Sequence, residues 1–79
     1  MYLKIISLKG VEYESNIISL NIPTQSGEIT VLENHRPLIT LLKKGLAVII
    51  DQKNQKKELE INSGFMEVSP KNKINVLID

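Results

Sequence analysis

The chain has 79 residues, ten basic and nine acidic side chains, and a formal net charge of +1, so charge alone indicates neither a nucleic acid nor an anionic membrane as a partner. A chain of this length forms one domain with a thin core, for which docking to a partner is a common supplement. It has no cysteine and a single histidine, His35, which excludes disulfides and leaves too few ligands for a structural metal.

Residues 2–8 and 15–22 are the first two expected strands, because apolar residues recur in both with the spacing of extended chain. Residues 2–8 carry apolar side chains on both faces, so we expect this strand to be covered twice, by a second layer or by another protein. Residues 15–22 alternate with a period of two and have one wet side. Their predicted apolar face consists of Ile18, Leu20 and Ile22.

Residues 37–45 allow two interpretations. Pro37 suits the first position of a short helix, and Gly45 would end it. A segment this short, however, does not sustain a helix without tertiary support, and Ile39 and Thr40 prefer extended backbone. We therefore favour an extended strand or a single helical turn over a real helix.

The C-terminal half contains the remaining expected strands. Residues 45–51 again have apolar side chains on both faces and are expected to be covered on both. Residues 57–62 and 73–79 alternate with one apolar face, which is made by Leu59, Ile61, Ile74, Val76 and Ile78. Between them, Phe65 shares a face with Glu67. This face is either a contact surface or, with Phe65 as its cap, part of the core.

Short turn segments separate the strands, at Lys9-Gly10 and at residues 23–27, 53–55 and 69–72. Pro70 suits the first corner of a type I turn, and Asn72 tolerates left-handed backbone. Short strands joined by short turns pair antiparallel and close into a sandwich or flattened barrel to bury their apolar faces. The sequence thus predicts an all-β fold in one domain, residues 1–79, with no second domain.

Glu33, His35 and Arg36 form the one cluster that suggests catalysis, since together they offer an acid or base and an anion clamp. Such chemistry needs a nucleophile within hydrogen-bond reach, and next-but-one residues of a strand share a face without converging on one atom. A surface or loop-closing histidine bonded to backbone explains the same residues. We predict no catalytic residue, no metal site and no cofactor.

The lysines of residues 53–57 surround a turn and are interpreted as a solvated loop that protects the adjacent sheet edge. A nucleic-acid surface would add aromatic side chains or arginines, and the chain has three aromatics and one arginine. Gly27 and Gly64 stand alone, so there is no phosphate-binding glycine loop. Neither a nucleic acid nor a small-molecule substrate is expected.

Three motifs follow one another along the chain: MYLKIIS with a Gly10-Val11 turn, then PTQSGEITVLENHRPLITLLKKG, then NSGFMEVSPKNKINVLID. Together they resemble, over essentially the whole chain, the N-terminal β-sandwich of the epsilon subunit of the F-type rotary ATP synthase. Three matches in the correct order are more specific than any one of them. The resemblance implies two packed antiparallel sheets with about ten strands, in agreement with the fold expected from the alternation.

The resemblance also implies a function. In this family the domain is a non-catalytic rotor subunit that docks the gamma subunit to the c-ring and couples proton or sodium translocation to ATP synthesis. By position in the motifs, the c-ring-facing residues are Glu28, Glu33, Asn34, His35 and Arg36. The gamma-facing residues are Ser7, His35 and Thr40. The expected location is peripheral, on the cytoplasmic face of a bacterial inner membrane or the stromal face of a thylakoid, without membrane insertion.

The sequence departs from the family pattern at Thr30, Glu33, Arg36 and Ser63, where glycine, proline, alanine and glycine are usual. Three of these positions lie in the implied docking loop itself, so the charge of the partner surface is expected to differ from the common type. The family's helical hairpin does not follow Asp79, so we expect support of coupling without inhibition of ATP hydrolysis. The alternative from another class is a free-standing β-sandwich that binds some other protein.

Overall fold

The computed structural model describes all 79 residues and contains strands but no helix. The predicted all-β fold is confirmed, with eight strands where about ten were expected. No helix in the structure is long and apolar enough to cross a membrane. The strands are β1 (Tyr2–Ser7), β2 (Gly10–Thr24), β3 (Gly27–Val31), β4 (Leu38–Leu42), β5 (Gly45–Asp51), β6 (Lys56–Ile61), β7 (Gly64–Val68) and β8 (Lys73–Ile78).

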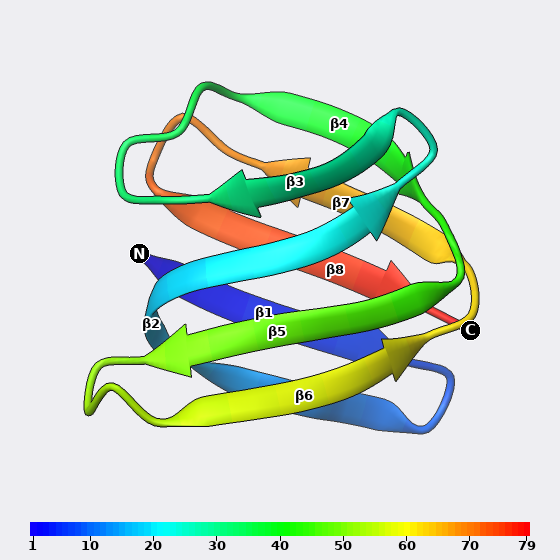
Figure 1. The fold of residues 1–79 in the computed structure, drawn as a ribbon, viewed down its shortest axis with the longest axis horizontal. Helices are drawn as coiled ribbons and strands as arrows, with labels where there is room; N and C mark the ends of the chain where they lie inside the picture. The colour runs from blue at the N-terminus through cyan, green and yellow to red at the C-terminus, as the bar shows by residue number, and fades with distance from the viewer.

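The long second strand explains part of the lower count. β2 spans 15 residues and pairs antiparallel with β1 through residues 10–16, then with β3 and β5 through residues 17–24. Its register against β5 shifts between Ile17 and Ser19, and such an irregularity bends a strand. Figure 1 shows β2 curving from beside β1 to beside β3 and β5, so one strand serves both layers.

The sheet is mixed. Its strand order is β1-β8-β7-β4-β2-β5-β6, with β3 on β2 and an additional pairing of β1 with β2. All pairs are antiparallel, as expected, except β1 and β8, which run parallel. These two strands come from opposite ends of the chain, so no short turn forces them to be antiparallel. The lysine-bearing β6 lies at the end of the strand order, where the sequence placed an edge.

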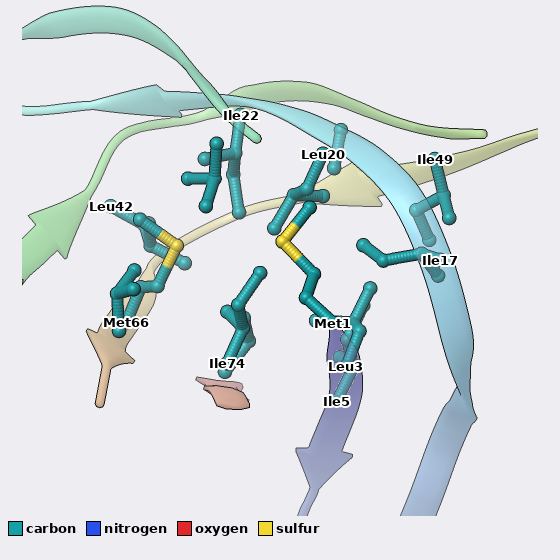
Figure 2. Close-up of a cluster of buried hydrophobic side chains, with 14 of the residues drawn as sticks. Met1, Leu3, Ile5, Ile17, Leu20, Ile22, Leu42, Ile49, Met66 and Ile74 are labelled. Carbon is teal, nitrogen blue, oxygen red and sulfur yellow. The ribbon is translucent and has the colours of Figure 1, made fainter. Parts of the chain in front are cut away.

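One apolar core lies between two layers, which follow the strand orders β4-β7-β8-β1 and β3-β2-β5-β6. It holds 15 buried residues drawn from every strand, and Figure 2 shows side chains from β1, β2, β5, β7 and β8 meeting there. Leu3 and Ile5 of β1, Leu20 and Ile22 of β2, and Met66 of β7 are all fully buried. No buried side-chain nitrogen or oxygen lacks a hydrogen bond, so burial leaves no polar side chain unpaired.

The predicted face of residues 15–22 is partly wrong. Leu20 and Ile22 are buried, but Ile18 is 44% exposed and Ile17 takes its place at 1%. The cause is the register shift after Ile17, because one extra residue moves the preceding side chains to the opposite face. A bulge of this kind leaves no mark in a count of alternating residues.

Other expectations are met or corrected by the strands themselves. Residues 38–42 are extended, so the helix alternative is wrong. Phe65 is 36% exposed while Met66 is buried, so Phe65 does not cap the core. In β5, Ala47 is buried but Leu46 is 42% exposed, so no second layer covers its outer face. The turn from Ser69 closes with the Asn72 N–H on the Ser69 carbonyl at 3.3 Å, and Asn72 has the expected positive φ of 64°.

Candidate functional site

The β3–β4 loop, residues 32–37, contains most of the predicted ring-facing residues and begins with a tight turn. The His35 N–H donates to the Leu32 carbonyl at 3.1 Å, and Asn34 has a φ of 62°. Asparagine tolerates this left-handed backbone better than most residues. Figure 1 shows the β3–β4 loop at the same end of the sandwich as the N-terminus.

Glu33 ties this loop to two other segments. Its Oε1 accepts a hydrogen bond from the N-terminal ammonium of Met1 at 3.0 Å, and its Oε2 accepts one from the side-chain amide of Asn72. Asn72 also accepts the Asn34 N–H through Oδ1, at 3.2 Å. The Asn72 hydrogen bond first, and the ammonium second, lower the pKa of the Glu33 carboxyl because both favour the charged form.

The cluster that suggested catalysis is not assembled. Glu33 is occupied by Met1 and Asn72, while Nδ1 of His35 lies 2.7 Å from the carbonyl oxygen of Arg36 and donates its proton there. His35 therefore closes the loop on backbone, as the less specific interpretation expected. No three His, Cys, Asp or Glu side chains are grouped so that they could hold a metal ion.

Arg36 makes no ion pair within the chain, where the salt bridges are Met1–Glu33 and Lys56–Glu58. Its side chain is exposed. An exposed guanidinium without a partner is available to a carboxylate on another protein.

Glu28 does not share a surface with this loop. It stands at the start of β3, opposite Pro23 in the β2–β3 hairpin, whereas Glu33 follows the end of the same strand. Five residues of extended chain separate the two by about 16 Å. Figure 1 shows the hairpin and the loop at opposite ends of the molecule. Glu28 is exposed and forms no ion pair within the chain.

The two remaining predicted residues lie apart as well. Ser7 ends β1, where its Oγ donates to Oε2 of Glu12 at 2.6 Å and accepts the Lys9 N–H at 3.1 Å. Thr40 is half-buried in the middle of β4, opposite Met66. The three predicted gamma-facing residues, Ser7, His35 and Thr40, thus lie in β1, the β3–β4 loop and β4 and do not form a cluster.

A continuous apolar row crosses the outer face of the layer β4-β7-β8-β1 and reaches β2. Leu41 of β4 pairs with Phe65 of β7, Phe65 pairs with Leu77 of β8, Leu77 with Ile6 of β1, and Ile6 with Val11 of β2. We call these five residues the apolar row. Paired residues point to the same side of a sheet. Leu41, Phe65, Leu77 and Val11 are 61%, 36%, 49% and 55% exposed, respectively.

A polar row runs beside it, one step along the strands. It consists of Glu67, Asn75, Lys4 and Glu14, each paired with the next. On β4 the position opposite Glu67 is the apolar Ile39, which is 66% exposed. An exposed apolar stripe with a polar border is typical of a protein-protein contact surface.

The sequence pattern indicated two residues of the apolar row but did not predict that the five form a continuous surface. Phe65 was singled out as a possible contact residue, and the two-sided apolar character of residues 2–8 included Ile6. Leu41, Leu77 and Val11 were missed. The alternation in residues 73–79 assigns Leu77 to solvent, whereas Val11 was placed in a turn and residues 37–45 were given no faces. Only the strand order brings them into one line.

The chain is thus a small all-β domain with an exposed apolar row on one face and an exposed β3–β4 loop at one end. The family model described as ATP synthase, Delta/Epsilon chain, beta-sandwich domain matches residues 1–79. This chain belongs to that family.

Several relatives are similar in sequence. The ATP synthase epsilon chain of Aquifex aeolicus is 37% identical over 67 residues, covering 85% of this chain and 49% of the relative. The epsilon chain of Sulfurimonas denitrificans is 39% identical, covering 98% and 58%. The mitochondrial ATP synthase subunit delta of Neurospora crassa is 38% identical, covering 86% and 41%. The chain thus spans about half the length of the curated relatives it matches.

Two solved structures share the fold. A chain in the Euglena gracilis mitochondrial ATP synthase, OSCP/F1/c-ring in rotational state 1, superposes with a TM-score of 0.90 at 19% identity, covering 96% of this chain and 48% of that one. A chain in the Tetrahymena thermophila mitochondrial ATP synthase, central stalk/c-ring, gives 0.82 at 13% identity, covering 99% and 62%.

Proposed function

We propose that this chain is a non-catalytic subunit of the central stalk of an F-type ATP synthase. It holds the gamma subunit against the c-ring, so that rotation driven by proton or sodium translocation is coupled to ATP synthesis. Its place in the delta/epsilon family supports this function, and the observation that carries it is the apolar row. A sheet face that leaves four large apolar side chains exposed gains from a protein partner.

The gamma subunit is our proposed partner for the apolar row. Ser7 and Thr40, the residues implied by the family pattern, lie in the same layer, in β1 and β4, next to Ile6 and Leu41 of the row. Thr40 pairs with the buried Met66, and both residues alternate to the face opposite the row, so the support for gamma as the partner is the row itself. Phe65 lies on β7, between Leu41 of β4 and Leu77 of β8, so a partner on the row would cover its ring from both sides. Aromatic residues at the centre of an interface often contribute about 2 kcal/mol or more to binding.

The β3–β4 loop is our proposed contact with the c-ring, through Asn34, His35 and Arg36. Glu33 belongs to the loop, but its carboxylate already binds Met1 and Asn72, so its role in contact is indirect. Glu28 makes a separate contact, because a partner touching both it and the loop must extend along the whole of β3. Charged residues at such rims set register more than affinity.

The location follows from the complex. We propose a peripheral position at the membrane face that carries the ATP synthase head, in a bacterium or a plastid. Relatives named as mitochondrial subunits show that the family also occurs in that organelle. Capture of a different partner by the apolar row, with no affinity for gamma or ring, would favour the free-standing binding module instead.

The test is binding of the purified chain to a gamma subunit and to gamma with c-ring. Phe65→Asp and Leu77→Asp place a charge in the apolar row and are expected to lower gamma affinity at least about 30-fold. Leu46→Asp is the matched control, since Leu46 has a similar exposure, 42%, but lies on β5 in the other layer. Unfolding curves verify that each variant is folded. Unchanged binding by both row variants, with loss in Leu46→Asp, contradicts the proposal.

A further inference from the structure

Three segments far apart in the sequence meet at Glu33. Its carboxylate binds the N-terminal ammonium of Met1 before β1 and the side-chain amide of Asn72 before β8, while Glu33 itself lies between β3 and β4. Asn72 reinforces the junction, because its Oδ1 accepts the Asn34 N–H at 3.2 Å and its carbonyl accepts the Tyr2 N–H at 3.1 Å.

The N-terminal residue is fixed by the core and by β2, independently of Glu33. Met1 is 7% exposed and packs in the core, and its carbonyl accepts the Ile17 N–H at 2.8 Å. The ammonium therefore has little freedom to move away from its position. Glu33 is the only carboxylate that forms an ion pair with it. A positive charge attached to a buried residue needs such a partner.

The loop, in contrast, has few other attachments. Its turn is closed by local contacts, from His35 N–H to Leu32 and from the His35 ring to Arg36. The connections from the loop to the rest of the molecule are those of Glu33 and the Asn34 N–H. Of these, the bonds to Glu33 are assisted by charge, which makes them shorter and stronger than neutral ones.

We propose that, in the 79-residue chain, the α-amino group of Met1 is a control point for the β3–β4 loop. As a free ammonium it holds Glu33, and Glu33 holds His35 and Arg36 in one conformation. Acylation of this nitrogen, by a formyl or acetyl group, removes the charge and leaves a single N–H, so the loop keeps only its contacts with Asn72 at full strength and becomes more mobile. Glu33 is the positioning residue of this device. The proposal concerns the order of the loop in the isolated chain and does not depend on the proposed function.

The experiment compares the 79-residue chain with a free Met1 amine and the same chain acetylated at Met1, using ¹⁵N relaxation. Order parameters of Asn34, His35 and Arg36 are expected to fall from about 0.85 toward 0.6 on acetylation. Asn54, in the β5–β6 turn and also with positive φ, is the control and is expected not to change. Unchanged order parameters in the loop after acetylation overturn the proposal.

Two substitutions test whether the effect of Met1 acetylation on the loop passes through Glu33. Glu33→Gln keeps the shape of the side chain without its charge, so its loop is expected to be mobile already and insensitive to acetylation. Glu33→Pro removes the carboxylate but makes the backbone of the turn rigid. Proline fits this position because Glu33 is the first corner of the turn, its φ is negative and its N–H makes no hydrogen bond. The proline loop is expected to be ordered with either N-terminus. Equal loss of order on acetylation in the parent and in Glu33→Pro contradicts the role of Glu33.

Discussion

Phe65 on β7 lies opposite Leu77 on β8, and both side chains point away from the core. The residue before Phe65 makes this pairing possible. A Cβ at Gly64 would lie 2.1 Å from the Leu77 carbonyl oxygen, so the two strands approach more closely here than any other residue type allows. The apolar row therefore depends on a backbone contact as well as on its own side chains.

Gly64→Ala is expected to destabilise the chain by about 2 kcal/mol or more, because the clash is with backbone and the φ of 155° disfavours a side chain. Urea unfolding measures the change. Gly10→Ala is the control, since its φ is 115° but an added Cβ would meet nothing within 4 Å, so only strain of about 1 kcal/mol remains. Equal losses in the two variants would mean that the contact with Leu77 relaxes without cost.

The bulge in β2 predicts opposite effects at neighbouring residues. Ile17→Ala removes a side chain that is 1% exposed and is expected to cost about 2 to 5 kcal/mol of unfolding free energy. Ile18→Ala removes one that is 44% exposed and is expected to cost well under about 1 kcal/mol. Simple alternation through Ile18, Leu20 and Ile22 would bury Ile18 and expose Ile17, so Ile18→Ala would then be the more destabilising change. Denaturation of the two variants therefore distinguishes the bulged strand from the regular one.

The sequence was sufficient for the fold class because period-two alternation and the turn residues act locally. Asn72, for example, was recognisable as a left-handed turn residue from its type alone, and its φ agrees. Ile18 was placed on the wrong face because a bulge is decided by pairing with another strand. Local patterns also carry no information on the parallel pairing of β1 with β8, which joins the two ends of the chain.

The candidate site was less predictable for the same reason. Position in the family motif named the loop residues, and it treated Glu28 as their neighbour although β3 separates them. The partner of Glu33 is the chain's own N-terminal ammonium, and such a long-range contact has no signal in a short window. The apolar row likewise exists only across strands, where each strand contributes one exposed residue.

We expect the Arg36 side chain to contribute to assembly with the c-ring and gamma subunit in a salt-dependent way. Because its guanidinium forms no ion pair within the chain, we expect it to bind a carboxylate of a partner. Arg36→Ala is expected to weaken assembly about 5-fold at low ionic strength and to have a smaller effect as salt is raised. Lys53→Ala, in the exposed β5–β6 turn, is the control. Equal assembly of Arg36→Ala and parent at every salt concentration would exclude a partner carboxylate for this residue.

The junction at Glu33 predicts a stability that falls in acid. Hydrogen bonds from Asn72 and from the Met1 ammonium hold the pKa of the Glu33 carboxyl below its ordinary value of 4.5. A carboxyl with a lowered pKa in the folded state stabilises the fold above its unfolded pKa, and this contribution is lost as pH falls through the folded pKa. The ammonium is the only charged group paired with Glu33, so Glu33→Gln should flatten the decline in melting temperature below about pH 4.5.

Asp79 is a second source of stability that is lost in acid, because hydrogen bonds from Ser63 lower the pKa of its carboxyl, and Asp79→Asn should remove a separate part of the decline. A Glu33→Gln curve parallel to that of the parent from pH 6 to about pH 2 would show that this carboxylate gains nothing from its two partners.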